Sequence, residues 1–115
     1  MRNQGKDHLV YQRNEIMNMT PAQLVLKLYD YAIMSCKLKD SGKVSKAIVE
    51  LISALDFNQG DIPLGLFRLY QYCMDIAKQE KYEEVLGILT ELRKTWATVI
   101  KENPIPKKSS KAQVI

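Results

Sequence analysis

An apolar residue recurs every three or four positions along most of this chain, and turn-forming segments interrupt the pattern at only four places. These breaks lie at residues 40–42, 58–61, 78–81 and 103–104. A spacing of three and four puts apolar side chains on one face of an α-helix, whereas a half-buried strand alternates every second residue. The sequence therefore predicts an all-α fold with four helices. Because short connections make neighbouring helices antiparallel, we expect an up-down four-helix bundle.

The ends of the predicted helices carry recognisable signals. Thr20, Pro21 and Gln23 form a capping box that begins the first helix. The third helix opens at Asp61, and the fourth stops before Pro104. The predicted core faces comprise Val25, Leu28, Tyr29, Ala32, Ile33 and Cys36; Val44, Ala47, Ile48, Leu51, Ile52 and Leu55; Leu66, Leu69, Tyr70, Cys73, Ile76 and Ala77; and Tyr82, Val85, Leu86, Leu89, Leu92, Trp96, Val99 and Ile100.

We expect three parts: an N-terminal cap segment at 1–19, the bundle at 20–102, and a disordered basic tail at 103–115. The formal net charge of the 115 residues is +4. Four lysines against Glu102 give residues 101–115 a net charge of +3, so the rest of the chain is nearly neutral. A nucleic-acid-binding module needs clustered basic residues on one face, so the nearly neutral charge of the predicted bundle argues against that function.

The N-terminus lacks a signal-peptide apolar region and no run is long enough to span a membrane, so we expect a cytoplasmic protein.

The residues that usually carry catalysis or bind metals are scarce. The chain has one histidine, His8, and two cysteines, Cys36 and Cys73, which fall on predicted core faces. A nucleophilic site therefore has no convincing base, and a zinc site lacks its clustered ligands. The five glycines form no phosphate-binding loop. We expect no catalytic residue, no cofactor site and no metal site, and hence a protein that is not an enzyme.

The first and third predicted helices are more apolar than one core face requires. Leu24, Leu26, Tyr31 and Met34 lie beside the core stripe of the first helix, and Leu64, Phe67 and Met74 lie beside that of the third. A helix that is apolar nearly all round is either buried on several sides or offers a second face to a partner. Central packing aided by the N-terminal segment would be one explanation. We favour an apolar groove that takes an amphipathic helix.

Several segments, in order along the chain, resemble the flagellar export chaperone FliS family. They are YQRN at 11–14, TP at 20–21, LVLKLYD at 24–30, LD at 55–56, LYQY at 69–72 and LTELRKTW at 89–96. The resemblance covers about residues 11 to 100. It implies a small antiparallel helical bundle in the bacterial cytosol that binds the C-terminal segment of flagellin. Such a chaperone prevents premature polymerisation and helps deliver flagellin to the type III export apparatus.

The resemblance also suggests which residues meet the partner. Tyr11 and Asn14 would belong to an N-terminal cap that flagellin displaces. The expected groove contacts are Leu24, Leu28, Tyr31, Leu66, Phe67, Tyr70 and Met74. Tyr29, Leu69, Leu89, Leu92 and Trp96 fit core positions better.

The chain departs from the family pattern in three places. The stretch from Asp30 to Leu55 is shorter than usual by about a dozen residues, which removes roughly two turns from each of the first two helices. Tyr31 replaces a small residue, and Asp75 and Ile76 stand where a basic pair is usual. Two alternatives remain: a FliS-like bundle that binds another export component or forms a homodimer, and a small nucleic-acid-binding helical module.

Overall fold

The computed structural model describes residues 19–102, and within them it has four α-helices and no strand. The helices are α2 (Pro21–Lys37), α3 (Ser41–Ser53), α4 (Asp61–Lys78) and α5 (Tyr82–Glu102). The prediction of an all-α fold is therefore confirmed for this part of the chain. Residues 1–18 of the predicted cap segment and the predicted tail at 103–115 lie outside the described residues.

Side-chain caps explain where the first two helices begin. Thr20 Oγ1 accepts a hydrogen bond from the backbone N–H of Gln23 at 3.1 Å, and the Thr20 N–H donates to Gln23 Oε1 at 3.0 Å. This reciprocal pair is the predicted capping box, and Pro21 occupies the first helical turn. Asp40 caps α3 in a similar way, because its Oδ1 accepts from the Lys43 N–H at 3.0 Å.

The connections between helices are short and use left-handed backbone. Lys39 (φ 57°) and Glu80 (φ 62°) follow the ends of α2 and α4, and Gly60 (φ 89°) precedes α4. Helix α3 ends at Ser53, whereas the core face predicted for it continues to Leu55. Leu55 is nevertheless only 9% exposed, so it contributes to the core from the loop that follows the helix.

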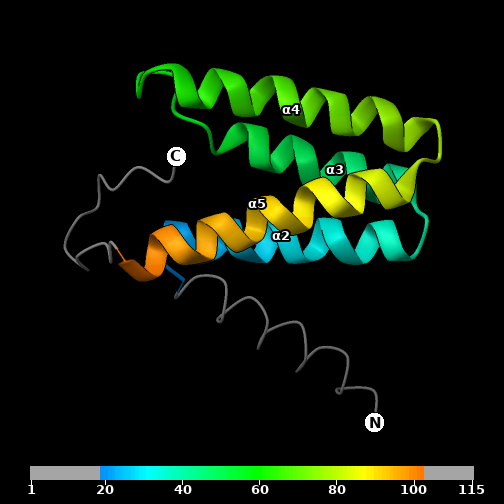
Figure 1. Ribbon diagram of the computed structural model, residues 1–115, viewed down its shortest axis with the longest axis horizontal. Coiled ribbons are helices and arrows are strands. Elements are labelled where there is room, and N and C mark those ends of the chain that lie inside the picture. The colour runs from blue at the N-terminus through cyan, green and yellow to red at the C-terminus, as the bar shows by residue number, and fades with distance from the viewer. Residues whose placement is uncertain (1–18, 103–115) are drawn as a thin grey trace, which may run out of the picture.

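Each of the four helices packs against two of the others. In Figure 1, α2 and α4 run from left to right, and α3 and α5 run from right to left. Helix α2 packs against both α3 and α5, and α4 packs against the same two helices from the other side. Each helix thus turns one face inward, and α4 and α5 separate toward the left of the view.

The centre of the bundle contains a polar contact among aromatic side chains. Tyr29 of α2 and Tyr70 of α4 have no exposed surface, and their hydroxyl groups share a hydrogen bond of 2.5 Å. Trp96 Nε1 of α5 donates to the same Tyr29 hydroxyl at 3.1 Å. Within the described residues, no buried side-chain nitrogen or oxygen lacks a partner. This contact joins three helices without leaving an unpaired polar group, whose burial would be costly.

Candidate partner-binding surfaces

Helix α4 carries an apolar face whose burial fades toward the start of the helix. The face consists of residues spaced by four and three: Ile62, Leu66, Leu69, Cys73 and Ile76. Cys73 and Ile76 are buried, Leu66 and Leu69 are half-buried, and Ile62 is 69% exposed. All five share one side of the helix, so the exposure of this side rises toward the start of α4, while the neighbouring Pro63 is buried on the core side.

Helix α5 shows the same gradient in the opposite chain direction. Its apolar face consists of Val85, Leu89, Leu92, Trp96 and Val99, again spaced by four and three. The first two residues have no exposed surface, the next two are half-buried, and Val99 is 41% exposed. The end of α5 and the start of α4 therefore open together.

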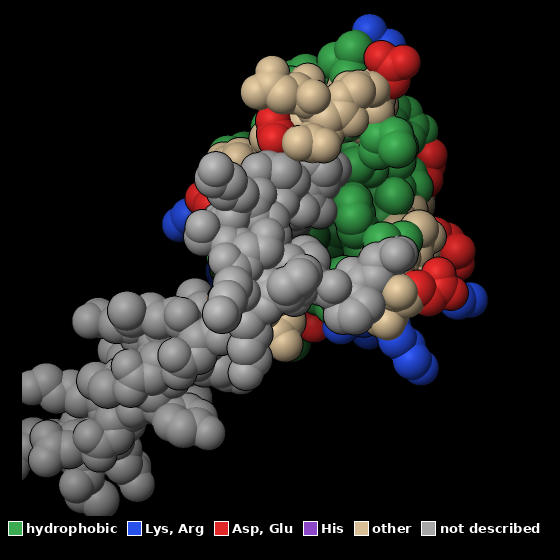
Figure 2. All heavy atoms as spheres, turned by 90° about the vertical axis from the view of Figure 1, so that its left-hand side faces the viewer, with side chains coloured by type: hydrophobic (Ala, Val, Ile, Leu, Met, Phe, Trp, Pro, Cys, Tyr) green, Lys and Arg blue, Asp and Glu red, His purple; other side chains and the backbone are tan. Residues whose placement is uncertain are grey.

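We call the opening between these two ends the α4–α5 groove. We assign to it the half-buried or exposed residues of the two apolar faces, Ile62, Leu66 and Leu69 of α4 and Leu92, Trp96 and Val99 of α5. Figure 2 views the molecule from this end and shows a continuous area of hydrophobic side chains. An exposed apolar area of this kind is typical of a surface that binds a partner.

One side of α5 is acidic along its length. Glu84, Glu91 and Glu102 are separated by seven and eleven residues, so they share one side of the helix, and all three are exposed. Glu84 Oε2 accepts a hydrogen bond from the Tyr72 hydroxyl of α4, which shows that this side of α5 faces α4. This hydrogen bond raises the pKa of Tyr72.

The wall of the groove is fixed by the central aromatic contact. Trp96 is half-buried, and its ring is held by the hydrogen bond from Nε1 to Tyr29. Burial raises the pKa of the Tyr29 hydroxyl, so this acceptor stays neutral at physiological pH. A large aromatic side chain that is already held in place loses little conformational freedom when a partner binds.

A second apolar surface lies on the outer side of α2, and we call it the α2 stripe. Its residues follow one another at intervals of seven, three and four: Leu24, Tyr31, Met34 and Leu38. Their exposed fractions are 37%, 44%, 60% and 64%. The core side of α2 is formed instead by Val25, Tyr29, Ala32 and Cys36. The stripe is therefore a separate face and not an edge of the core.

The structure distributes the predicted contact residues over several places. Leu66 lines the α4–α5 groove, whereas Tyr70 is fully buried at the centre. Phe67 and Met74 are half-buried on another side of α4, where the Phe67 ring meets Phe57 edge to face at a centroid distance of 5.8 Å. Phe57 lies in the α3–α4 connection, so this side of α4 turns away from the groove.

The remaining predicted contacts lie on α2 or outside the described residues. Leu24 and Tyr31 belong to the α2 stripe, and Leu28 is half-buried against the core. Tyr11 and Asn14 lie outside the described residues. The sequence indicated the excess of apolar surface and placed Leu92, Trp96 and Val99 on the core face. Leu92 and Trp96 are half-buried and pack against the core, whereas Val99 is 41% exposed. Their loss of burial near the end of α5 gives no signal in a single sequence.

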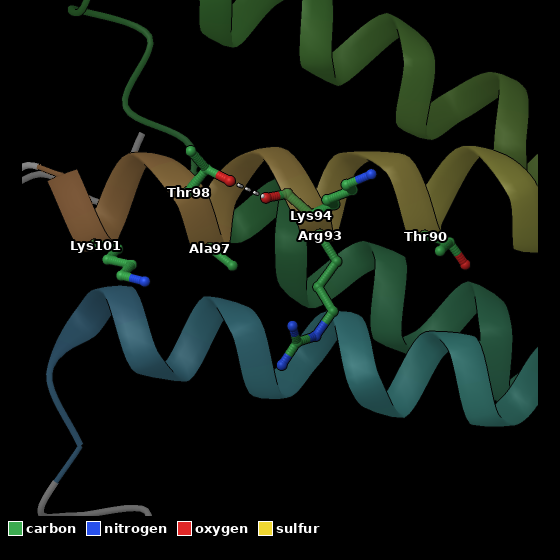
Figure 3. Close-up of a pocket in the computed structure, with 6 residues that line it drawn as sticks. All are labelled: Thr90, Arg93, Lys94, Ala97, Thr98 and Lys101. Atoms are coloured by element: carbon green, nitrogen blue, oxygen red, sulfur yellow. Dashed lines mark hydrogen bonds between the residues drawn. The ribbon is translucent and has the colours of Figure 1, made fainter.

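A shallow hollow on α5 carries positive charge but has no features of a ligand site. It is lined by Thr90, Arg93, Lys94, Ala97, Thr98 and Lys101. Figure 3 shows Arg93 reaching from α5 toward α2, where its guanidinium forms a two-point ion pair with Asp30 at 2.5 and 3.3 Å. The hydroxyl of Thr98 donates to the backbone carbonyl of Lys94 at 3.0 Å, the dashed line in the same view. The ion pair connects α2 to α5, whereas the Thr98 hydrogen bond lies within α5.

The two cysteines are buried thiols. Burial raises the pKa of Cys36 to about 11 and that of Cys73 to about 12. Such thiols stay protonated at neutral pH, which makes them poor nucleophiles and poor metal ligands. Among residues 19–102, no group of three or more histidine, cysteine or acidic side chains could hold a metal ion.

Comparison with protein families identifies the chain. The sequence profile described as flagellar protein FliS matches residues 37–103, which is more than half of the chain. This protein belongs to the FliS family. The match begins at the end of α2 and includes α3, α4 and α5, and therefore the whole α4–α5 groove. No curated protein and no solved structure matches the chain.

The FliS family is a family of flagellar export chaperones and not of enzymes, and this is the general role that membership implies. Its expected partner is of the flagellin type. Within the described residues, no helix combines the length and the apolar character needed to cross a membrane.

Proposed function

We propose that this protein is a cytosolic chaperone of flagellar type III export that binds the C-terminal segment of flagellin. It would keep flagellin from polymerising early and help deliver it to the export apparatus. Family membership supports the general role. The observation that carries the proposal is the α4–α5 groove, an apolar surface that opens between two helices and offers a place for an amphipathic helix.

The binding mode follows from an up-down antiparallel bundle, which we infer from the short connections and helix directions. A partner segment would lay its apolar side along Ile62 and Leu69 on one wall and Trp96 on the other. A segment that is disordered when free loses conformational entropy when it folds in the groove. This cost lowers the affinity for a given contact area. The flagellin segment can therefore cover a large surface of the chaperone and still be released.

The resemblance to the family also suggests a role for the N-terminal segment. Residues 1–19, with Tyr11 and Asn14, would occupy part of the apolar surface and be displaced by flagellin. The predicted contact roles of Leu24, Leu28, Tyr31, Phe67, Tyr70 and Met74 stay predictions. Among the predicted contacts, Leu66 is the one that our proposal places inside the groove.

Co-purification with flagellin tests the proposal. We expect full-length flagellin to bind and flagellin that lacks its C-terminal segment to be lost. The variant Ile62→Glu places a charge in the groove and should weaken binding by roughly tenfold or more. Leu64→Glu is the matched control, because Leu64 is an exposed residue of α4 outside the groove lining and its variant should bind normally. Binding that survives the flagellin truncation, or an equal loss in both variants, would contradict the proposal.

A further inference from the structure

The α2 stripe is not part of the α4–α5 groove, so it requires its own explanation. The stripe extends over the fifteen residues from Leu24 to Leu38, the C-cap residue of α2, or about 21 Å of helical rise. Each of its four residues is more than a third exposed, and Leu38 and Met34 are the most exposed of them. A surface of this length matches about four turns of a partner helix.

The charges around the stripe are mostly positive. Lys27 lies within it, four residues before Tyr31, and Lys37 stands beside Leu38. Lys43 and Lys46 follow in the first turns of α3, and all four lysines are exposed. Within residues 19–102, none of these lysines forms an ion pair.

The nearby carboxylates do not neutralise this edge. Asp40 caps α3 through the Lys43 N–H, and Asp30 is paired with Arg93 of α5. Glu50 of α3 remains as one exposed acidic residue against the four lysines. Lys39 borders a separate hollow with Glu80 and Glu83.

We propose that the α2 stripe binds an acidic amphipathic helix of a second protein partner, at the same time as the groove holds its own segment. The partner's apolar residues would meet Tyr31 and Met34, and its carboxylates would meet Lys27 and Lys37. Complementary charge of this kind selects a partner and speeds its association.

A second copy of this chain fits the stripe less well. In a two-fold pair of α2 helices, the basic edge of one molecule would face the basic edge of the other, and like charges would repel. The exposed apolar residues are also few, because a stable interface uses about 20–30 residues on each side. A single helix needs no more than the stripe provides.

The experiment uses the full-length protein and two synthetic peptides of eighteen residues. Both peptides have leucine at the a and d positions of a heptad, and they carry either glutamate or lysine at the flanking e and g positions. Backbone NMR titration gives the affinity and maps the site. We expect the glutamate peptide to bind about tenfold more tightly at low salt, to shift the amides of residues 24–38, and to lose this preference at high salt.

Three variants make the result decisive. Met34→Glu should abolish binding of the glutamate peptide, and Lys27→Glu combined with Lys37→Glu should reverse the preference toward the lysine peptide. Ile62→Glu should leave the peptide bound while it weakens flagellin binding, so failure of this inference is separable from failure of the proposed function. Equal affinity for both peptides would overturn the inference. So would shifts confined to the groove, loss of flagellin binding in Met34→Glu, or a homodimer that Met34→Glu dissociates.

Discussion

The α4–α5 groove and the α2 stripe are both apolar, but they differ in shape and in the charge at their edges. The groove lies between two separating helices, and Glu91 and Glu102 lie on the side of α5 that faces α4. The stripe lies on one convex helix, with lysines around it. A concave surface can bury a partner on two sides and supply more apolar contact, whereas a convex stripe depends more on charge complementarity. The two partners that we propose would thus be distinguished by shape and by charge.

The largest effect on both surfaces is expected when the core that supports them is disrupted. Tyr70 is fully buried and bonds to Tyr29, which lies beneath the α2 stripe and also anchors Trp96 in the groove. Tyr70→Ala leaves a large cavity and should cost about 3–5 kcal/mol in the free energy of unfolding. Urea denaturation measures this loss, and we expect both binding activities to fall with it.

Tyr70→Phe is the control for that variant. It keeps the ring and removes the hydroxyl, while Tyr29 still accepts from Trp96 Nε1. We expect a cost of about 1 kcal/mol, with both surfaces intact. If the two Tyr70 variants unfolded at the same urea concentration, the packing of the ring would not be the main contribution.

A smaller change should separate the two surfaces. Trp96→Ala removes an aromatic wall of the groove and should weaken flagellin binding by about tenfold or more. Trp96→Phe keeps most of the wall and should lose much less. Both variants should bind the acidic peptide as the unchanged protein does, because Trp96 lies on α5 and not on the stripe. A titration of each partner with each variant provides the measurement, and a parallel loss of both would show that the surfaces are coupled.

The sequence predicted the helices better than the surfaces, and α4 and α5 show why. The spacing of Cys73, Ile76, Val85 and Leu89 indicated core positions, and all four are buried. Leu69, Leu92 and Trp96 continue the same spacing, so the sequence placed them in the core too. Periodicity reports which side of a helix a residue occupies, but it does not report where the neighbouring helix diverges. The groove depends on that divergence, which is a property of the packed bundle.

The α2 helix shows the opposite case. Its apolar excess was visible in the sequence because Leu24, Tyr31 and Met34 lie beside a complete core face. The sequence left open whether this excess packs in the core or meets a partner, and the exposed fractions show that Leu24, Tyr31 and Met34 lie at the surface. The charge at its edge was not used in that prediction, although Lys27 and Lys37 belong to the same helix and are exposed.

A rise in pH above 9 should lower the free energy of unfolding, because the core beneath both surfaces contains two buried thiols. Cys36 lies on the core side of α2, and Cys73 lies on that of α4. Their folded pKa values of about 11 and about 12 exceed the ordinary thiol value of 9.0, so the unfolded chain loses these protons first. Stability is therefore complete below pH 9 and should fall as the pH rises from 9 toward 11.

Urea denaturation between pH 8 and pH 10.5 measures this fall. Burial also raises the pKa values of Tyr29 and Tyr70, which should extend the decline above pH 10. In a variant with Cys36→Ala and Cys73→Ala, the free energy of unfolding should depend less steeply on pH between 9 and 10. A slope equal to that of the unchanged protein would show that the thiols do not cause the decline.

The smallest expected effect concerns the ion pair that links the two surface-bearing helices. Asp30 of α2 pairs with Arg93 of α5, and both side chains are at least a third exposed. Exposed pairs contribute about 0–1 kcal/mol, so Asp30→Asn should change the free energy of unfolding by no more than that. Because the pair lies on the side of α2 that faces α5, its loss should leave the stripe and the groove in place. Affinities for flagellin and for the acidic peptide should both stay within about twofold of the original values, since exposed charges are screened by salt. A larger loss at either surface would mean that the ion pair sets the position of α5 against α2, and that the two surfaces respond to each other through this contact.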